Sequence, residues 1–404
     1  MTVINASKTK NKWLNRNIWA MGWTSFFSDY GHEMATAILP SFIVLLGGSA
    51  ALLGLIEGLA DASTSLFKVV SGWYSDYIGK RKPFAMIGYF LTAVGVGSLS
   101  LATSWPFVLL SRVVAWIGRG TREPPRDAML ADSVKPEHVG KAFGLNRALD
   151  TLGAILGPAL AVILIRTVKL NYIFLIALIP STLAFLTISI FVKERRKQSE
   201  RTSFIVSVRN LPRNFKLYLI AVGLFGLGNF ADSLLILRAT DLLSPTRGAV
   251  VAGSLAIVLY VVHNVFYAAL SFPVGVLADK IGKKTLLALG YLLTGISVIG
   301  FIFNIGNLAY LGLFFVLAGI AIAITDAMEK IVAADLLPEN LRGTGYGTLA
   351  TVNGVGDFAS STIVGSLWTA ISPLAGFGYS AVLTLSGAGL LFGMRSTRKI
   401  VVNK

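Results

Sequence analysis

The sequence predicts an all-α integral membrane protein, built from two repeats of six transmembrane helices. Of its 404 residues, 54% are hydrophobic and 14% are charged, whereas a soluble globular protein has about 25% charged residues. Long apolar runs recur along the chain, such as YIFLIALIPSTLAFLTISIFV at 172–192. About 20 apolar residues cross a 30 Å hydrocarbon core as a helix. A constant offset of 203 residues between matching segments predicts the repeat.

Polar breaks divide the chain into twelve apolar segments, and each is expected to form a membrane-spanning helix. The first segment is too long for the apolar part of a removable signal peptide, so we expect it to be retained. The segments are 17–47, 51–76, 84–104, 105–133, 139–166, 171–193, 216–242, 249–278, 284–304, 306–337, 341–371 and 374–395. An even number of spans places both termini on one side of the membrane.

Basic residues predict which side that is. The two tails and the loops on the same side hold 25 of the 36 Lys and Arg residues, and the opposite loops hold only Arg166, Lys169 and Arg247. This bias predicts cytoplasmic termini in a multi-pass protein of the cell (plasma or inner) membrane. The net charge of +16 then faces the anionic inner leaflet of the bilayer, so we expect no nucleic-acid partner.

The longest polar break lies at the midpoint of the chain and reads KERRKQSERTSFIVSVRNLPRNFK at 193–216. We interpret residues 194–216 as a cytoplasmic linker that lies partly on the membrane surface. It separates an N-terminal six-helix half, 1–193, from a C-terminal half, 217–404.

The two halves match in one register. GWYSDYIGKRK begins at Gly72 and GVLADKIGKKT begins at Gly275, an offset of 203. The same offset relates Ala131-Asp132 to Ala334-Asp335, Gly144 to Gly347, Gly153 to Gly356 and Asp29 to Asp232. Parallel repeats of this kind predict a transporter whose site lies between the halves near the bilayer midplane.

The segment that starts at Gly72 has features of a gating loop. Gly72 allows a neighbouring helix to approach closely, and Asp76 ends the second span, where it can pair with another helix N-terminus or an Arg. Gly79 permits a tight turn. A basic triplet at the headgroups follows, namely Lys80, Arg81 and Lys82. The triplet could also serve only as a topology signal.

This loop resembles the signature loop between helices 2 and 3 of the major facilitator superfamily, and the segment with Gly275, Asp279 and Gly282 resembles its partner between helices 8 and 9. The resemblance covers nearly the whole chain. It implies the major facilitator fold, alternating access by the two halves, and a loop that latches the outward-facing state. It also implies a monomer that carries a small-molecule substrate and needs no cofactor.

Two further segments resemble the drug/proton antiporters of that superfamily, an efflux branch. GAILGPALA in the fifth span, with Gly153, Gly157 and Pro158, resembles their Gly-x-x-x-Gly-Pro element, although Ala161 and Val162 replace its final small residues. The glycines offer a close-packing face and the proline a kink. Arg112 resembles their membrane-embedded Arg, but Ala and Trp follow it where Gln and Gly are usual. The resemblance favours antiport.

GRGTREPPRDAMLAD at 118–132 resembles a prokaryotic group of transporters with an Arg-x-x-x-Arg-Asp-Ala signature. The fourth span enters from the outside near Trp105, so residue 119 lies about 20 Å further along, towards the cytoplasmic mouth. Pro124-Pro125 is expected to break the helix there. We interpret four charged residues of this segment as gating groups that can engage Asp76, or alternatively recruit anions. They are Arg119, Arg122, Arg126 and Asp127.

Ionisable residues inside the spans are the candidate site, because each costs about 2.5–3.5 kcal/mol at the bilayer centre on insertion scales. They are Asp29, His32 and Glu33 in span 1; Glu57, Asp61 and Lys68 in span 2; Arg147 and Asp150 in span 5; Asp232 in span 7; Asp326, Glu329 and Lys330 in span 10; and Asp357, near Asn353, in span 11. The resemblance places helices 1, 4, 7 and 10 on the central path. Asp29, Asp232, Asp326 and Glu329 are therefore the first candidates for a proton or cation site.

Carboxylic acids in a poorly hydrated cavity can carry protons near neutral pH, and His32 titrates there even without perturbation. The alternative is structural ion pairing within a helix, for which the spacing suggests Arg147–Asp150, Lys68–Asp61 and Lys330–Asp326. A second alternative is a divalent metal held by Asp29, His32 and Glu33. His32 and Glu33 have no repeat partner, since Leu235 and Ile236 stand at the matching positions, so they indicate what is particular to this protein.

The leading hypothesis is a secondary active transporter that exports small organic or cationic compounds with proton coupling. One alternative is a proton-coupled uptake symporter for a small metabolite or anion that uses the arginines of spans 4 and 5. Another is a non-transporting membrane receptor. The sequence contains no phosphate loop, no nucleophile elbow, no metal cluster of normal spacing and no cysteine, so we expect neither an enzyme nor a resident metal.

Overall fold

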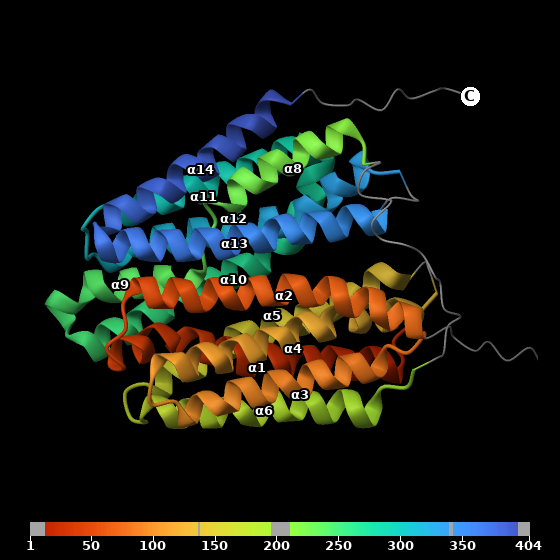
Figure 1. The fold of residues 1–404 in the computed structure, drawn as a ribbon, viewed down its shortest axis with the longest axis horizontal. Helices are drawn as coiled ribbons and strands as arrows, with labels where there is room; N and C mark the ends of the chain where they lie inside the picture. The colour runs from red at the N-terminus through yellow and green to blue at the C-terminus, as the bar shows by residue number, and fades with distance from the viewer. Residues whose placement is uncertain (1–12, 136–137, 195–210, 339–341, 395–404) are drawn as a thin grey trace, which may run out of the picture.

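The computed structural model describes residues 13–135, 138–194, 211–338 and 342–394, and over these ranges it is helical, without a β-strand (Figure 1). In chain order the helices are α1 (Arg16–Leu45), α2 (Ala50–Ile78), α3 (Lys82–Ser98), the 3₁₀ turn η1 (Leu99–Leu101), α4 (Trp105–Asp132), α5 (Val139–Leu164), α6 (Leu170–Phe191), α8 (Arg213–Gly226), α9 (Asp232–Arg247), α10 (Ala249–Ile281), α11 (Lys283–Ile302), α12 (Leu308–Leu336), α13 (Arg342–Ala370) and α14 (Pro373–Gly393). Eight of these helices are long and apolar enough to cross a membrane.

The seventh predicted span, 216–242, is not one helix. α8 ends at Gly226 and α9 begins at Asp232, with an irregular stretch between them. Two polar groups of this stretch find side-chain partners on other helices: the Ala231 amide donates to Ser361 Oγ at 3.0 Å, and the Gly228 carbonyl accepts from the Ser380 hydroxyl. Non-helical backbone inside a bilayer requires such partners, because lipid offers none.

Proline does not break α4, contrary to the expectation for Pro124-Pro125, and the helix continues to Asp132. Pro124 lacks the amide that would bond the Gly120 carbonyl. The Ser71 hydroxyl of α2 donates to that carbonyl at 3.0 Å instead. α2 lies close enough because Gly120 has no side chain, and a Cβ there would meet the Thr64 backbone. The neighbouring helix thus supplies the missing hydrogen bond.

The six helices before the linker form one half and the helices after it form the other, with the N-terminal half below the C-terminal half in Figure 1. Each half carries a similar ion pair. The base lies between α2 and α3 in one half and at the start of α11 in the other, and the acid lies at the end of α4 or near the end of α12. Arg81 Nη1 lies 2.5 Å from Asp132 Oδ2, and Lys283 Nζ lies 2.9 Å from Asp335 Oδ2. The two acids are 203 residues apart, as in the repeat, whereas the two bases are 202 residues apart, since Arg81 matches Lys284 in the sequence. The side chains of Asp76 and Asp279, and residues 195–210 of the linker, lie outside the described part, so their gating and membrane-surface roles stay predictions.

The halves pack closely at the end away from the linker. A Cβ at Gly54 of α2 would meet the Ser361 backbone of α13, and one at Gly365 would meet the Ala50 backbone. The Ala51 amide also donates to Thr369 Oγ1 at 2.9 Å. Towards the linker end, on the right in Figure 1, α2 and α13 diverge. The structure is therefore closed at the end opposite the linker.

The predicted glycine face of α5 packs within its own half. A Cβ at Gly153 or at Gly157 would meet the α1 backbone, at Phe26 and Tyr30 respectively. Pro158 follows inside the same continuous helix. These residues hold α5 against α1, and the assignment of a gating function to them stays a prediction.

Substituting Gly54 by Leu is expected to destabilise the protein. The new side chain must displace the α13 backbone, and overpacking of this kind costs about 1–3 kcal/mol, more than the helix propensity gained. Thermal unfolding in detergent measures the change. Gly389→Leu is the control, since open space surrounds a Cβ there, and its melting temperature should not fall. An equal response of the two variants would contradict close packing at Gly54.

Candidate functional site

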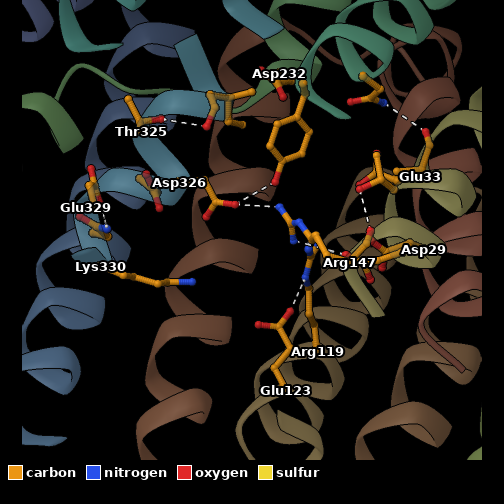
Figure 2. Close-up of a pocket in the computed structure, with 18 of the residues that line it drawn as sticks. Asp29, Glu33, Arg119, Glu123, Arg147, Asp232, Thr325, Asp326, Glu329 and Lys330 are labelled. Carbon is orange, nitrogen blue, oxygen red and sulfur yellow. Dashed lines mark hydrogen bonds and ion pairs between the residues drawn. The ribbon is translucent and has the colours of Figure 1, made fainter. Parts of the chain in front are cut away.

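Two neighbouring cavities lie between the halves, with volumes of about 420 Å³ and 350 Å³. Both are lined by Glu33 and Arg119 from the N-terminal half and by Asp232 and Tyr260 from the C-terminal half. The larger cavity receives charged side chains from both halves, as Figure 2 shows. The predicted location between the repeats therefore coincides with a charged, hollow region.

Asp29, His32 and Glu33 of α1 each contact a different partner. Asp29 Oδ1 lies 3.8 Å from Arg122 Nη2. The His32 ring stacks on Trp116 with centroids 4.0 Å apart, and its Nε2 lies 3.0 Å from an Arg119 nitrogen.

Glu33 contacts the C-terminal half, because its Oε2 accepts a hydrogen bond from the Tyr260 hydroxyl of α10 at 2.8 Å. The trio therefore does not converge on one point, and no group of three acidic or His side chains in the described ranges could hold a metal ion. The geometry gives the metal alternative no support.

Arg112 forms a buried ion pair with Glu57. Its Nε and Nη2 lie 3.0 and 3.1 Å from the two carboxylate oxygens, and Nη2 also donates to Thr36 Oγ1 at 2.9 Å. The Arg112 side chain is 0% exposed, and its guanidinium lies 3.5 Å from the centroid of the Trp116 ring. Bidentate pairing and a cation–π contact stabilise a charge that would otherwise be costly here.

Trp116 extends this network to the next acid, because its indole nitrogen donates to Asp61 Oδ1 at 2.9 Å. Lys68 does not pair with Asp61, contrary to the suggestion from spacing. Its Nζ lies 2.7 Å from Glu123 of α4, which also accepts from Arg119 at 2.9 Å. Asp61 and Lys68 are seven residues apart, about 10 Å along the helix axis, so an acid on the neighbouring helix lies nearer.

Arg147 joins the two halves. Its Nη1 lies 3.3 Å from Asp150, as the spacing suggested, and its Nη2 lies 2.7 Å from Asp326 of α12 (Figure 2). The Tyr267 hydroxyl donates to the same Asp326 oxygen at 2.8 Å. The suggested Lys330–Asp326 pair is absent among the described residues, and the Lys330 side chain extends into the cavity (Figure 2). The charge of Asp326 is thus balanced by Arg147 of the other half and not by Lys330 of its own helix.

Three acids are held by neutral donors. Glu33 accepts from Tyr260 and Asp61 from Trp116, as described above. Glu329, which is 8% exposed, accepts from the Tyr291 hydroxyl and from the Asn353 amide, each at 2.7 Å. None of these acids forms an ion pair with a described residue. Such carboxyl groups can exist in the charged or the protonated form without leaving a cation unpaired.

The whole chain resembles one family of membrane proteins. Residues 21–258 and 248–403 match the family model described as Major Facilitator Superfamily.

The chain belongs to the major facilitator superfamily.

An uncharacterized MFS-type transporter of Methanocaldococcus jannaschii is 37% identical over 385 residues, 94% of this chain and 95% of the relative. A multidrug resistance protein, MdtH of Aeromonas hydrophila, is 31% identical over 119 residues, 30% of each chain.

Solved structures agree with the superfamily fold. A variant of the nucleoside transporter NupG superposes with a TM-score of 0.80 at 12% identity, over 93% of this chain and 100% of that one. A bacterial homolog of the human lysosomal transporter Spinster, described as inward-facing and occupied, superposes with a TM-score of 0.72 at 16% identity, over 93% and 95%. At these identities the likeness shows the fold alone. This family is a class of membrane transporters, not of enzymes.

In this transporter, three predicted gating arginines on α4 line the larger cavity: Arg119, Arg122 and Arg126. Arg122 is 1% exposed and lies 4.5 Å from the ring centroid of Tyr89. Arg126 Nε donates to Asp127 at 3.0 Å and its Nη1 to Ser25 at 3.0 Å. Asp232 also lines the cavity, at the first turn of α9.

Sequence reasoning did not find Tyr89 and Tyr291, because a tyrosine within an apolar run looks like packing. For Tyr291 the only signal is chemical, because a buried tyrosine hydroxyl needs a hydrogen-bond partner. Tyr89 instead contacts Arg122 through its ring. The hydroxyl groups of Tyr260 and Tyr267 also reach acids of the site, Glu33 and Asp326 respectively.

Replacing Glu57 by Gln is expected to lower the free energy of unfolding by about 3–5 kcal/mol, because breaking a buried ion pair leaves Arg112 as an unpaired buried charge. Asp335→Asn, which removes an exposed pair, should cost at most about 1 kcal/mol. Denaturation in detergent compares them. A double variant, Glu57→Leu with Arg112→Met, should recover part of the loss, and equal stability of the two single variants would contradict the assignment.

Proposed function

We propose that this transporter exports small organic compounds, including cations, in exchange for protons by alternating access. The observation that supports this most is the hydrogen bond from Tyr260 to Glu33. It joins the halves across the cavities, and Glu33 has no cationic partner among the described residues. A carboxylate can only accept at this position, whereas a protonated carboxyl can also donate. Proton binding would therefore change a contact between the two moving halves.

The proposed orientation in the membrane indicates which step of the transport cycle the structure represents. With cytoplasmic termini, as the basic loops suggest, the closed end faces outside and the diverging end faces the cytoplasm. The conformation would then be inward-facing and ready to receive a compound from the cell. In export, closure at the linker end would follow substrate binding, and protons would enter from outside to reset the carboxyl groups.

The composition of the larger cavity supports a cationic substrate. Nine Asp and Glu residues line it against six Lys and Arg residues. Acids in excess attract positive charge into a low-dielectric cleft. The multidrug resistance proteins among the relatives are consistent with efflux, since one of them matches 30% of this chain.

The second candidate is proton-coupled uptake of an anion. Lys330 lines the larger cavity and forms no ion pair within the described ranges, and Arg147 lies in the same cavity. A carboxylate or phosphate on a substrate could pair with both. The direction of proton-driven flux separates this candidate from export.

Glu33→Gln is expected to uncouple transport. In proteoliposomes, flux of a labelled substrate driven by a pH gradient should fall at least about tenfold, equivalent to 1.4 kcal/mol. Substrate exchange without a gradient should persist, because Gln can still accept from Tyr260. Suitable substrates come from a growth screen of an overexpressing strain against toxic compounds.

Asp241→Asn, at an exposed position in the second half of α9, is the control and should keep gradient-driven flux. Full gradient-driven flux in Glu33→Gln would disprove the assigned coupling. An absence of flux of every compound that the screen selects would instead favour the receptor alternative.

A further inference from the structure

A third, smaller cavity of about 70 Å³ lies inside the C-terminal half. It is bounded by the irregular stretch between α8 and α9 and by α9, α10, α11 and α12. We call it the side chamber. Asp232 lines the side chamber and both larger cavities, so its carboxyl group stands at the junction of all three.

The hydroxyl groups of the side chamber are available as acceptors only. Thr294 donates to the Gly290 carbonyl at 3.1 Å, Ser297 to Phe314 at 2.8 Å and Thr325 to Ile322 at 3.3 Å. Each hydroxyl proton is therefore already used, and each oxygen has only lone pairs to offer. The side chamber thus presents acceptor oxygens from three hydroxyl groups and one carboxyl group.

Two ionisable groups of the side chamber lack partners within the described ranges. His263 is 1% exposed, and neither of its ring nitrogens has a hydrogen-bond partner. Asp232 forms no ion pair, and no Lys or Arg lines the side chamber. Its position in the first turn of α9 places it where a helix stabilises negative charge. A half-buried carboxylate without an ion pair and a buried imidazole without a hydrogen-bond partner together point to a missing ligand.

We propose that the side chamber binds one small monovalent cation of the size of Na⁺. Carboxylate and hydroxyl oxygens are hard ligands that suit such ions. One carboxylate balances one positive charge, and no second acid lines the side chamber to balance a divalent ion. A helix interrupted inside the bilayer is also a frequent position for cation sites in transporters.

The neutral His263 ring completes the site through its lone pair or through a water molecule on the ion. Because Asp232 also faces the larger cavities, the bound cation would neutralise a charge that the substrate meets. The site thereby gives the transporter a second ion, distinct from the proton at Glu33. The inference goes beyond the proposed function, since it needs neither Glu33 nor a direction of transport.

The test is thermal unfolding of the full chain in detergent, at one pH and one ionic strength, in sodium chloride, potassium chloride or choline chloride. A ligand that binds only the folded state raises its melting temperature. We expect Na⁺ to raise it saturably by about 2–4 °C over choline, with a smaller effect of K⁺. Asp232→Asn should abolish the Na⁺ response, whereas Asp241→Asn, the same change on the same helix outside the side chamber, should retain it.

Thr325→Val tests the same site without removing charge, and it keeps the side-chain volume while removing one oxygen. It should raise the Na⁺ concentration needed for half of the shift at least about fivefold, which is about 1 kcal/mol. Equal melting temperatures of the unmodified protein in Na⁺ and choline would overturn the proposal. So would an unchanged Na⁺ response in Asp232→Asn, or in Thr325→Val where Asp232→Asn does not fold. Glu33→Gln should keep the Na⁺ response, so failure here leaves the proton-coupling test separate.

Discussion

Every charge placed inside an apolar helix bundle needs a partner on a neighbouring helix, and this constraint orders the N-terminal half. Two arginines of α4 face acids of α1 and α2, namely Arg122 with Asp29 and Arg112 with Glu57, and in the reverse sense Lys68 of α2 faces Glu123 of α4. Arg112 with Glu57 is the most buried case, because the guanidinium is fully enclosed and also contacts Thr36 and Trp116. Since the pair is stable only when both partners are in place, it fixes how α4 sits against α2.

The same rule applies to the backbone. Pro124 in α4 and the break after Gly226 each free polar groups inside the bundle, and each time a serine of another helix bonds one of them: Ser71 at Gly120, Ser361 at Ala231. Glycines allow close approaches at both places. A Cβ at Gly120 would meet α2, which supplies Ser71, and a Cβ at Gly228 would meet α14, whose Ser380 donates to the Gly228 carbonyl. Irregular backbone next to the cavity is thus stabilised from outside its own helix. This is how the side chamber can exist in the C-terminal half without loss of the fold.

The helical, apolar character of the chain was predictable, because apolar runs of this length are a local property of the sequence. The break between Gly226 and Asp232 was not predicted, since its hydrogen-bond partners lie on other helices. It predicted the pairing of charges poorly. Lys68 and Lys330 both have an acid at helical spacing, yet Lys68 pairs with Glu123 of another helix, and Asp326 pairs with Arg147 of the other half. Which helices are neighbours decides these partners, and spacing along one helix carries no such information. The Glu33–Tyr260 contact could not be predicted from the sequence for the same reason.

Several glycine and aspartate positions match between the two halves, but some charged positions carry a different charge in each half. At an offset of 203, Arg119 matches Ile322, Arg126 matches Glu329 and Asp127 matches Lys330. α4 therefore presents arginines to the cavity where α12 presents neutral or acidic groups. Opposite charges on facing helices of the two halves attract each other. Asp326 matches Glu123 in the repeat, so this position is acidic in both halves, and Asp326 pairs at 2.7 Å with Arg147 of α5 in the other half. In the mechanism that we propose, a substrate or proton that neutralises one of these charges would weaken that attraction, so binding and the separation of the halves would be linked by the same electrostatics.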